Sequence, residues 1–398
     1  MKLRTLDDLG DVAGLSVFVR ADLNVPIEGG AVADDARIRA TVPTLVELLE
    51  RGAGLVVASH LGRPKGQVRE ELRLAPVARR LGELLGREVR ALDLVTGEPV
   101  REACAALQPG QVLMLENLRF DPREEANDPA FAEELAALAE AYVDDAFGAA
   151  HRAHASVEAL PRAMLARGRP AVAGRLLQRE VEVLSRLRED PERPYVAVLG
   201  GAKVSDKLGT IAALVERVDA LLLGGAMAFT FLAAEGAEVG RTLVEPERFD
   251  EVRGARRLAG ERGVLLELPV DAVAAPEASA DARWRTVPAR EIPRDHMALD
   301  IGPRTVEEFA RIVADARTVL WNGPMGVFEL EPFSAGTRGV ATAIAGCRAF
   351  KVAGGGDTLA AIARAGLSDS FDHLSTGGGA SLEFLEGREL PGIAVLEA

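Results

Sequence analysis

The stretch Tyr195-Val-Ala-Val-Leu199, followed at once by Gly200-Gly201-Ala-Lys203, decides the fold class. Its apolar, β-branched run predicts a buried strand, and the glycines after it are typical of a turn at the carboxyl end of a strand. Similar short apolar runs alternate with longer amphipathic stretches along the whole chain, which is the pattern of βα units. We therefore predict an α/β protein built on mainly parallel sheets.

Further strand candidates lie on both sides of this stretch. They are Ser16–Arg20, Leu55–Ser59, Val112–Leu115 and Tyr142–Val143 in the first half, and Ala220–Leu223, Val264–Leu268, Ala298–Ile301, Thr318–Trp321 and Ala349–Val352 in the second. Amphipathic segments such as Thr41–Arg51, Leu74–Leu85 and Pro129–Glu140 predict helices between them. The two halves thus share an architecture.

A helix between the two halves is predicted over Gly174–Asp190. Leu177, Val181, Leu184 and Leu187 would share one face of it, and prolines follow directly. We interpret the segment as an interdomain helix over residues 174–190, joining two Rossmann-like domains over 1–173 and 191–385. The alternative is a surface helix of one large domain.

Length and composition indicate a globular protein of two or three domains, with 398 residues, 48% hydrophobic and 27% charged. No run of 18 uncharged apolar residues occurs and the first residues lack a secretory signal, so we expect a cytosolic protein without membrane contact. A net charge of −14 opposes general attraction to nucleic acid or anionic lipid. Cys104 and Cys347 stand far apart and are expected to be reduced.

The chain has 42 Arg but only 5 Lys and 4 Asn, which GC-rich coding or adaptation to heat could both explain. The few Lys and Asn that remain are therefore easily located. Two of them are Lys203 and Lys207, and Asn24, Asn117 and Asn322 stand beside other unusual residues.

Cationic and polar residues follow the strands of the first half, where ligands of parallel sheets bind. They lie in Arg20–Asn24, Ser59–Arg63, Glu116–Arg119 and Asp145–His154, and Arg37 lies nearby. Arginine and histidine converging from separate loops predict a site for a small polyanion. The alternative for any single Arg is a solvated surface charge. A metal pair of His151 and His154 lacks supporting ligands.

Glycine-rich turns follow the strands of the second half instead. They are Gly200–Lys203, Gly224-Gly225, Asp300–Pro303, Trp321–Pro324, Gly354–Asp357 and Thr376–Gly379. Glycine lets backbone amides approach phosphates or a flat base, so the set predicts a nucleotide site, although each turn alone could be only a tight turn. Neither a GxGxxG nor a GxxxxGK[ST] motif occurs, which argues against a dinucleotide fold and a Walker loop.

Lys203 and Lys207 are four residues apart at the start of a predicted helix, so we expect them on one face, reaching the same ligand. Asp357 could hold Mg²⁺ on nucleotide phosphates, or it could cap a helix. For Lys203 and Lys207, the alternative is an exposed pair that binds no ligand. Anion and nucleotide sites in two domains predict a transferase with a hinged cleft that closes and excludes water.

At this point the residues resemble a known family, phosphoglycerate kinase. The shared motifs are VRADLNVP (Val19–Pro26), SHLGRP (Ser59–Pro64), ENLRF (Glu116–Phe120), DAFGAAHRAHAS (Asp145–Ser156), GGAKVSDK (Gly200–Lys207), WNGPMGVFE (Trp321–Glu329), GGGDT (Gly354–Thr358) and STGGGASLEFLEG (Ser375–Gly387). They run in the family's order along essentially the whole chain. Leu23, Ala149 and Ala226 depart from the usual pattern without removing a charged group.

The resemblance implies Mg²⁺-dependent phosphoryl transfer between 1,3-bisphosphoglycerate and ADP, giving 3-phosphoglycerate and ATP, in a monomer. It implies a glycerate-phosphate site made of Asp22, Leu23, Asn24, Arg37, His60, Leu61, Gly62, Arg63, Arg119, His151 and Arg152. It implies a nucleotide site made of Lys203, Lys207, Gly302, Asn322, Glu329, Gly355, Gly356, Asp357 and Thr358, with Asp357 on the metal and Glu329 on the ribose. Arg37 and Lys203 would act on the transferring group. The segment 386–398 would return to the first domain.

Two other functions compete with this interpretation. A nucleotide-dependent oxidoreductase on paired α/β domains lacks its GxGxxG fingerprint. A non-catalytic phosphate-sensing protein would be expected to have lost Arg37, Lys203 or Asp357, and all three are present.

Overall fold

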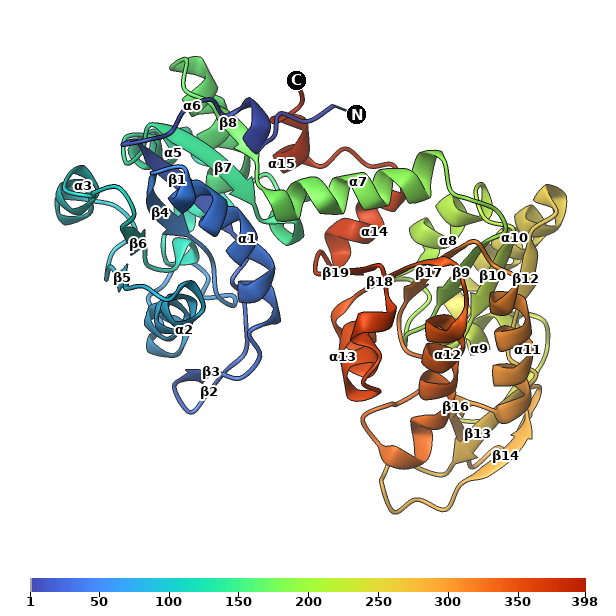
Figure 1. Ribbon diagram of the computed structural model, residues 1–398. Coiled ribbons are helices and arrows are strands. Elements are labelled where there is room, and N and C mark those ends of the chain that lie inside the picture. Colours follow the sequence, from blue (N-terminus) through green and yellow to red (C-terminus); the bar gives the residue numbers. More distant parts are fainter. Residues whose placement is uncertain (1) are drawn as a thin grey trace. The chain divides into compact units, whose positions relative to one another are not determined.

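The computed structural model describes residues 2–398 and divides them into two compact units, each an α/β structure (Figure 1). One unit runs up to Glu182 and includes residues 389–398, and the other covers Val183–Arg388. The division falls inside α7 (Arg175–Glu189), the helix that occupies most of the segment expected between the domains.

The first unit is built on a six-stranded parallel sheet in the order β5-β6-β4-β1-β7-β8. Its strands are β1 (Ser16–Ala21), β4 (Gly54–Ala58), β5 (Val89–Ala91), β6 (Val112–Met114), β7 (Ala141–Asp145) and β8 (Ala171–Ala173), with a small hairpin of β2 (Ile27–Glu28) and β3 (Ala31–Val32). Its helices are α1 (Ala36–Glu50), α2 (Ala75–Leu85), α3 (Glu98–Ala105), α4 (Pro122–Glu125), α5 (Pro129–Ala136), α6 (Leu160–Ala166) and α15 (Pro391–Ala394). The strands predicted in this half are confirmed, while β5 (Val-Arg-Ala) and β8 (Ala-Val-Ala) lack a run of bulky apolar residues and are not among the predicted strands.

The alternation of side chains along β1 explains how both faces of this sheet are covered. Val17 and Val19 belong to one apolar core together with Ile38 and Leu45 of α1 and Leu81 of α2. On the opposite face, the Phe18 ring stacks on that of Tyr142 with centroids 6.0 Å apart. Each such fully buried apolar side chain stabilises the fold by roughly 1.5–3 kcal/mol. This burial fixes β1, and therefore the loop that follows it.

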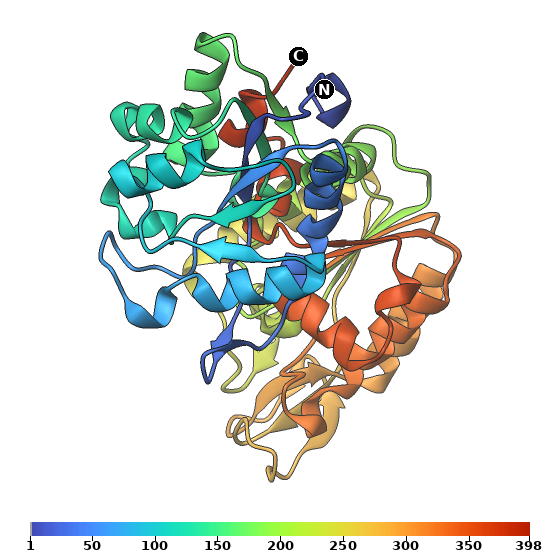
Figure 2. The same ribbon diagram turned by 60° about the vertical axis from the view of Figure 1, so that its left-hand side comes forward.

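The two ends of the chain meet within the first unit (Figure 2). The Arg4 amide donates to the Leu396 carbonyl at 3.0 Å, and the Ala398 amide donates to the Lys2 carbonyl at 2.9 Å. The last residues of the sequence therefore complete the unit formed by the first residues.

The second unit contains a six-stranded parallel sheet in the order β12-β10-β9-β17-β18-β19. Its strands are β9 (Tyr195–Leu199), β10 (Ala220–Leu223), β12 (Leu265–Glu267), β17 (Thr318–Asn322), β18 (Phe350–Gly354) and β19 (His373–Ser375). Its helices are α8 (Leu208–Val215), α9 (Gly225–Ala234), α10 (Phe249–Arg262), α11 (Pro303–Ala314), α12 (Ala335–Gly346), α13 (Gly356–Arg364) and α14 (Gly379–Leu385). The strand over Tyr195–Leu199 is confirmed and fully buried near the centre of the sheet.

One face of this sheet is covered by α11, α12 and α13, which lie side by side in Figure 1. Phe309 of α11, Ile344 of α12 and Ile362 of α13 share a core with Val198 and Trp321 of the sheet. The packing fixes where α13 begins, directly after β18.

The expectation that Ala298–Ile301 is another strand of the parallel sheet is wrong. Its strand, β16 (Met297–Ile301), belongs to a separate antiparallel sheet with β13 (Asp271–Ala275) and β14 (Arg285–Pro288). Leu299 packs there with Val273 and Phe333 in a small core of its own. An apolar run looks alike in either kind of buried strand, so the sequence did not distinguish them. A further parallel pair is formed by β11 (Glu238–Val239) and β15 (Glu291–Ile292).

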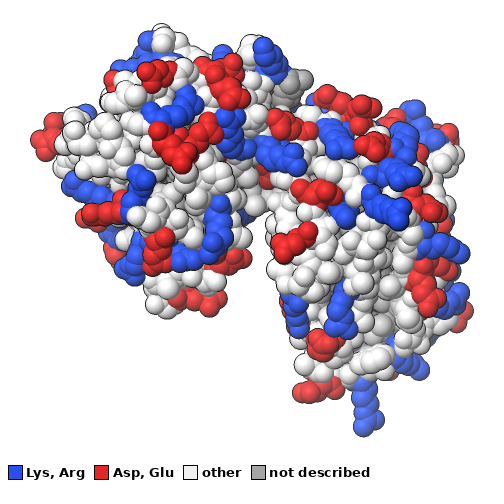
Figure 3. Space-filling model, viewed as in Figure 1, with Lys and Arg blue, Asp and Glu red and all other residues white. Residues whose placement is uncertain are grey.

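Charges of both signs are interspersed on the visible face of each unit (Figure 3). Some ion pairs lie within one helix, such as Arg80 with Glu83 in α2 and Arg253 with Asp250 in α10. None of the helices within residues 2–398 combines the length and the apolarity needed to cross a bilayer.

Candidate active site

The carboxyl ends of β1, β4, β6 and β7 bring the predicted anion-binding residues to one edge of the first sheet. β1 lies between β4 and β7. The chain adds β4, β6 and β5 on one side of β1 and β7 and β8 on the other, so the direction of strand order reverses at β1. Such a reversal leaves a crevice between the loops, where ligands of open parallel sheets bind. The loops that follow these four strands carry ten of the predicted residues, and Arg37 comes from the first turn of α1.

Asp22 and Asn24 hold two neighbouring elements in place after β1. The Arg37 guanidinium donates to the buried Asp22 carboxylate at 2.7 Å. The Asn24 side-chain oxygen accepts from the Gly62 amide at 2.9 Å, which joins the loop after β1 to the loop after β4. Arg37 is only partly buried, with 33% of its side chain exposed.

Asn117 is the centre of the loop packing at this edge. Its side-chain oxygen accepts from the Leu61 amide at 3.2 Å and the Arg119 amide at 3.1 Å. Its amide group donates to the carbonyls of Leu61 at 2.8 Å and Leu72 at 3.0 Å. Arg119, itself 6% exposed, then donates to the Gly62 carbonyl at 2.9 Å. Asn117 therefore fixes the loops that present His60 to Arg63 and Arg119.

A buried chain of polar groups lies beneath His60. Arg20 is completely buried in β1, and one of its nitrogens lies 3.1 Å from His60 Nδ1. Its Nε donates to the Ser156 hydroxyl at 2.8 Å, and that hydroxyl donates to buried Glu124 at 2.6 Å. Burial, with help from Arg20 and Arg119, lowers the pKa of His60 well below its ordinary value. His60 is thus neutral at pH 7, and because Arg20 can only donate, His60 Nδ1 accepts from it and Nε2–H is left as the donor toward a ligand.

The loop after β7 adds two further histidines and an arginine. Arg152 Nε donates to His151 Nε2 at 3.1 Å, and both side chains reach toward solvent more than His154 does. His154 is buried and its Nδ1 has no hydrogen-bond partner within residues 2–398. Burial and the nearby Arg119 and Arg20 lower its pKa to about 3. The edge thus combines permanent guanidinium charge with the neutral imidazoles of His60 and His154.

Sequence reasoning named Arg20, Asn117 and His154 among the residues after the strands but selected none of them for the site. A buried arginine inside an apolar strand is a signal for Arg20, since lone charges are rarely buried without a partner. The side chain of Asn117 makes four hydrogen bonds to Leu61, Leu72 and Arg119, and sequence spacing does not reveal this role.

The glycine-rich turns of the second unit surround a cavity of about 410 Å³. Its lining is Gly200 to Lys203, Asp206, Lys207, Asn322, Gly323, Pro324, Gly355 to Thr358, Gly378, Gly379 and Leu382. These residues follow β9, β17, β18 and β19, and β9 with β17 marks the reversal of strand order in this sheet. Seven of the nine predicted nucleotide residues line this one cavity.

Close contact between two turns explains why glycine is needed here. A Cβ at Gly200 would collide with the carbonyl oxygens of Pro324 and Gly323. Gly323 has φ +100°, which residues with side chains rarely adopt. The Gly323 amide in turn donates to the buried Thr358 hydroxyl at 2.6 Å. The first two turns are therefore packed backbone against backbone, the third is bound through the Thr358 side chain, and seven of the sixteen lining residues are glycines.

The expectation that Lys203 and Lys207 share a helix face is wrong. The helix, α8, begins only at Leu208, and both lysines lie in the preceding loop. The Lys207 amide closes a turn on the Val204 carbonyl at 2.9 Å, and its ammonium contacts Asn322 Oδ1. Both lysines nevertheless line the cavity. Burial lowers the pKa of Lys207 to about 8, an effect that Asp206 and Asp357 partly offset.

Asp357 lies in the first turn of α13 and is exposed at the cavity. Asp206 is the other carboxylate of the lining. Among residues 2–398, no group of three or more His, Cys, Asp or Glu could enclose a metal ion. Mg²⁺ on a nucleotide typically takes one or two protein carboxylates and completes its shell with phosphate oxygens and water, so this donor set fits it.

Gly302 and Glu329 are the two predicted nucleotide residues that do not line the cavity. Gly302 precedes α11, and a Cβ there would collide with the Asp271 carboxylate that caps the same helix. Glu329 is exposed on the turn that follows β17. Its backbone carbonyl accepts from Arg364 of α13 at 3.1 Å.

Known proteins resemble this chain over nearly its whole length. A family model described as phosphoglycerate kinase matches residues 6–388. The phosphoglycerate kinase of Thermomicrobium roseum is 58% identical over 99% of both chains, and that of Moorella thermoacetica is 52% identical over 98% of both. The solved structure of the enzyme from Coxiella burnetii matches 99% of this chain and 98% of its own with a TM-score of 0.88 and 41% identity. The solved structure of phosphoglycerate kinase from Pyrococcus horikoshii also matches 99% of this chain and 98% of its own, with a TM-score of 0.86 and 34% identity.

Proposed function

The chain belongs to the phosphoglycerate kinase family, and on that premise we propose how its residues perform the reaction. The enzyme is a kinase of glycolysis that transfers a phosphoryl group between 1,3-bisphosphoglycerate and ADP, giving 3-phosphoglycerate and ATP. One observation supports the assignment of residues: the two units carry different sites. The first has an edge of guanidinium and imidazole groups, and the second has a cavity lined by glycine-rich turns.

The edge of the first unit binds the glycerate phosphate in this proposal. Arg37, Arg63, Arg119 and Arg152 supply charge and paired N–H donors for phosphate or carboxylate oxygens. Asp22 and Asn24 orient Arg37 and the loop at Gly62. His60, kept neutral by burial, offers a directional hydrogen bond without a further charge. His151, Leu23, Leu61 and Gly62 complete the predicted contact set.

The cavity of the second unit binds the nucleotide. The phosphates of the nucleotide would approach the first turn of α13, where backbone N–H groups and the helix dipole favour anions. Lys207 adds a cation at the same place. Glu329 is proposed to accept from ribose hydroxyls, and Gly302 to lie beside the nucleotide. We therefore assign the 3-phosphoglycerate domain to the first unit and the nucleotide domain to the second.

The chemical step needs no general base, because the oxygen that accepts the phosphoryl group from ATP is a carboxylate already ionised at pH 7. What remains is to position donor and acceptor and to neutralise charge on the equatorial oxygens of a loose transition state. We assign that task to Arg37 from the first unit and Lys203 from the second. Because Arg37 and Lys203 must both reach the transferring phosphoryl group, the two units would close on each other during turnover.

Asp357 would hold Mg²⁺, which when bound supplies positive charge to the nucleotide phosphates. The exposed carboxylate at the mouth of a phosphate-sized cavity supports this role. A cytosolic, monomeric enzyme is the state we propose, since both substrates are small polar molecules and both edges lie within one chain.

The test is a coupled assay of the purified protein with 3-phosphoglycerate, ATP and Mg²⁺, in which NADH oxidation reports the 1,3-bisphosphoglycerate formed. We expect turnover that needs all three components. A folded protein that binds ATP but shows no turnover contradicts the assignment and favours a phosphate-sensing role.

A further inference from the structure

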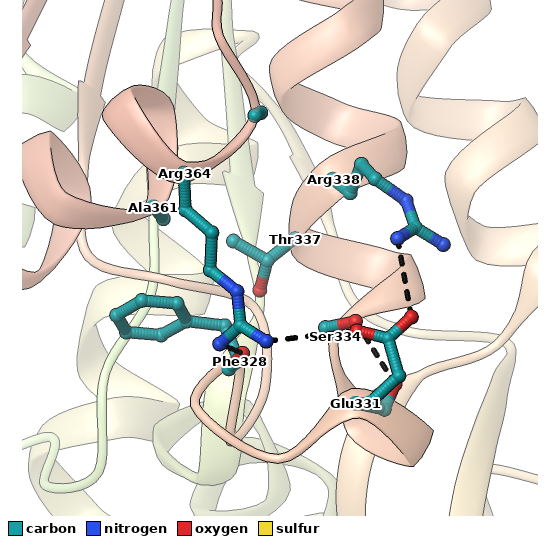
Figure 4. A pocket seen from close by; sticks show the side chains of 8 residues that line it. Phe328, Glu331, Ser334, Thr337, Arg338, Ala361 and Arg364 are labelled. Atoms are coloured by element: carbon teal, nitrogen blue, oxygen red, sulfur yellow. Dashed lines mark hydrogen bonds and ion pairs between the residues drawn. The ribbon is translucent and has the colours of Figure 1, made fainter.

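A second, smaller cavity of about 210 Å³ lies between α12, α13 and the turn after β17 (Figure 4). Two arginines line it, Arg338 from α12 and Arg364 from the end of α13, and Glu331 lies between them. Arg338 donates to Glu331 Oε1 at 3.4 Å, while Arg364 lies 3.6 Å from Glu331 Oε2. These ion pairs are long and largely exposed, and such pairs contribute little.

The contacts that distinguish the two arginines are with the backbone. One terminal nitrogen of Arg364 donates to the Phe328 carbonyl at 2.9 Å and to the Glu329 carbonyl at 3.1 Å. A charged donor makes stronger hydrogen bonds than a neutral one. The Arg338 guanidinium instead donates to the Glu331 carboxylate. Arg364 therefore holds the main chain on both sides of the Glu329 Cα, and Arg338 does not.

The position of Arg364 on α13 connects this contact to the nucleotide cavity. The first turn of the same helix carries Asp357 and Thr358, which line that cavity. At about 1.5 Å per residue, the helix is a rod of roughly 13 Å. Its buried face is fixed by Ile362 in the core. The helix thus sets the distance between the phosphate end of the site and the Glu329 backbone.

We propose that Arg364 is a positioning residue for ribose recognition: it fixes the Glu329 backbone against α13, so that the exposed Glu329 carboxylate meets the ribose while the phosphates occupy the other end of the helix. This inference rests on the proposed function, in particular on Glu329 as the ribose contact. In this proposal Arg364 acts through the Glu329 backbone and makes no contact with the nucleotide.

The test compares ATP with 2′,3′-dideoxy-ATP, which lacks both ribose hydroxyls, as substrates in the coupled assay. For the wild type we expect kcat/KM to favour ATP by roughly tenfold, as for one lost hydrogen bond to a charged group. Arg364→Ala should reduce this ratio to within about twofold of unity and leave the KM for 3-phosphoglycerate unchanged, since the ribose contact alone is disturbed. Arg364→Lys keeps one charged donor and should give an intermediate ratio.

Arg338→Ala is the matched control, because it removes the other arginine of the same cavity and should keep the wild-type ratio. The inference is overturned if Arg364→Ala keeps the wild-type ratio, if Arg338→Ala loses it equally, or if the active wild type does not discriminate between the two nucleotides. Loss of all turnover in the wild type would instead reject the proposed function. If Arg364→Ala does not fold, Arg364→Lys decides: an intermediate ratio supports the inference and a wild-type ratio overturns it.

Discussion

The candidate anion edge of the first unit and the cavity of the second differ in what faces the ligand. In the first, side chains do so, and buried polar groups such as Asn117 and Arg20 hold them in place. In the second, the main chain does so, and the turns approach so closely that Gly200 and Gly323 admit no Cβ. A side-chain site depends on its supporting hydrogen bonds, whereas a main-chain site depends on the absence of side chains.

The largest effect should come from removing the cation that each edge contributes to the transferring group. Arg37→Ala and Lys203→Ala should each lower kcat by roughly 10² to 10³, since a lost transition-state contact costs about 2.7–4 kcal/mol. The KM values for both substrates should change far less. Steady-state kinetics measure both quantities. A variant with nearly wild-type kcat would contradict the shared role of the two edges.

The anion-binding edge of the first unit should depend on Asn117, although we assign this residue no contact with a ligand. Asn117→Ala leaves the Leu61 and Arg119 amides without their buried acceptor, at a cost of about 1–3 kcal/mol for each unsatisfied group. Thermal unfolding should show the loss of stability, and the KM for 3-phosphoglycerate should rise while that for ATP does not. Gln108→Ala, which removes an exposed amide bonded to Ala106, is the control and should change neither.

The main-chain cavity should be sensitive to a single methyl group. Gly200→Ala places that group against the carbonyls of Pro324 and Gly323, and such overpacking typically costs about 1–3 kcal/mol. We expect a rise in the KM for ATP with little change for 3-phosphoglycerate. Gly254→Ala in α10, where a Cβ meets no atom within 4 Å, should be neutral or stabilise by up to about 1 kcal/mol. Equal effects of the two substitutions would refute the close-packing argument.

The smallest effect concerns pH. Because the pKa of Lys207 is lowered to about 8, the free protein loses this charge above pH 8, while bound phosphates favour the charged form. Affinity for ADP should therefore fall as pH rises above 8, by at most tenfold per pH unit. Lys207→Arg should remove this dependence, as calorimetric titration from pH 7 to 9.5 can show. The same lowered pKa makes the fold more stable as pH rises from about 8 toward the ordinary lysine value, because the unfolded chain then binds more protons.

The sequence predicted the central strands well, because runs such as Tyr195–Leu199 are continuously apolar and end in glycine. It missed β5 (Val-Arg-Ala) and β8 (Ala-Val-Ala), which lack a run of bulky apolar residues, and it misplaced Ala298–Ile301, whose partner strand is not visible in its own residues. Pairing depends on long-range contacts, and a local pattern does not contain them.

For the candidate site, residue types after the strands and the family motifs identified most of the lining, but not its support. Lys203 and Lys207 reach the cavity from a loop rather than from a helix, since the chain must first turn at Val204. The roles of Arg20, Asn117 and Arg364 follow from burial and from hydrogen bonds between loops distant in sequence. Only the folded chain shows such contacts.

The central claim is that the two edges bind different substrates, and the most direct test measures the two affinities separately by calorimetric titration. Arg119→Ala should weaken 3-phosphoglycerate binding by roughly 10- to 100-fold, as expected for a lost charged hydrogen bond, and leave ADP binding within about twofold. Lys207→Ala should do the reverse. If each variant weakened both ligands equally, or if the pattern were inverted, the assignment of the two edges would be contradicted.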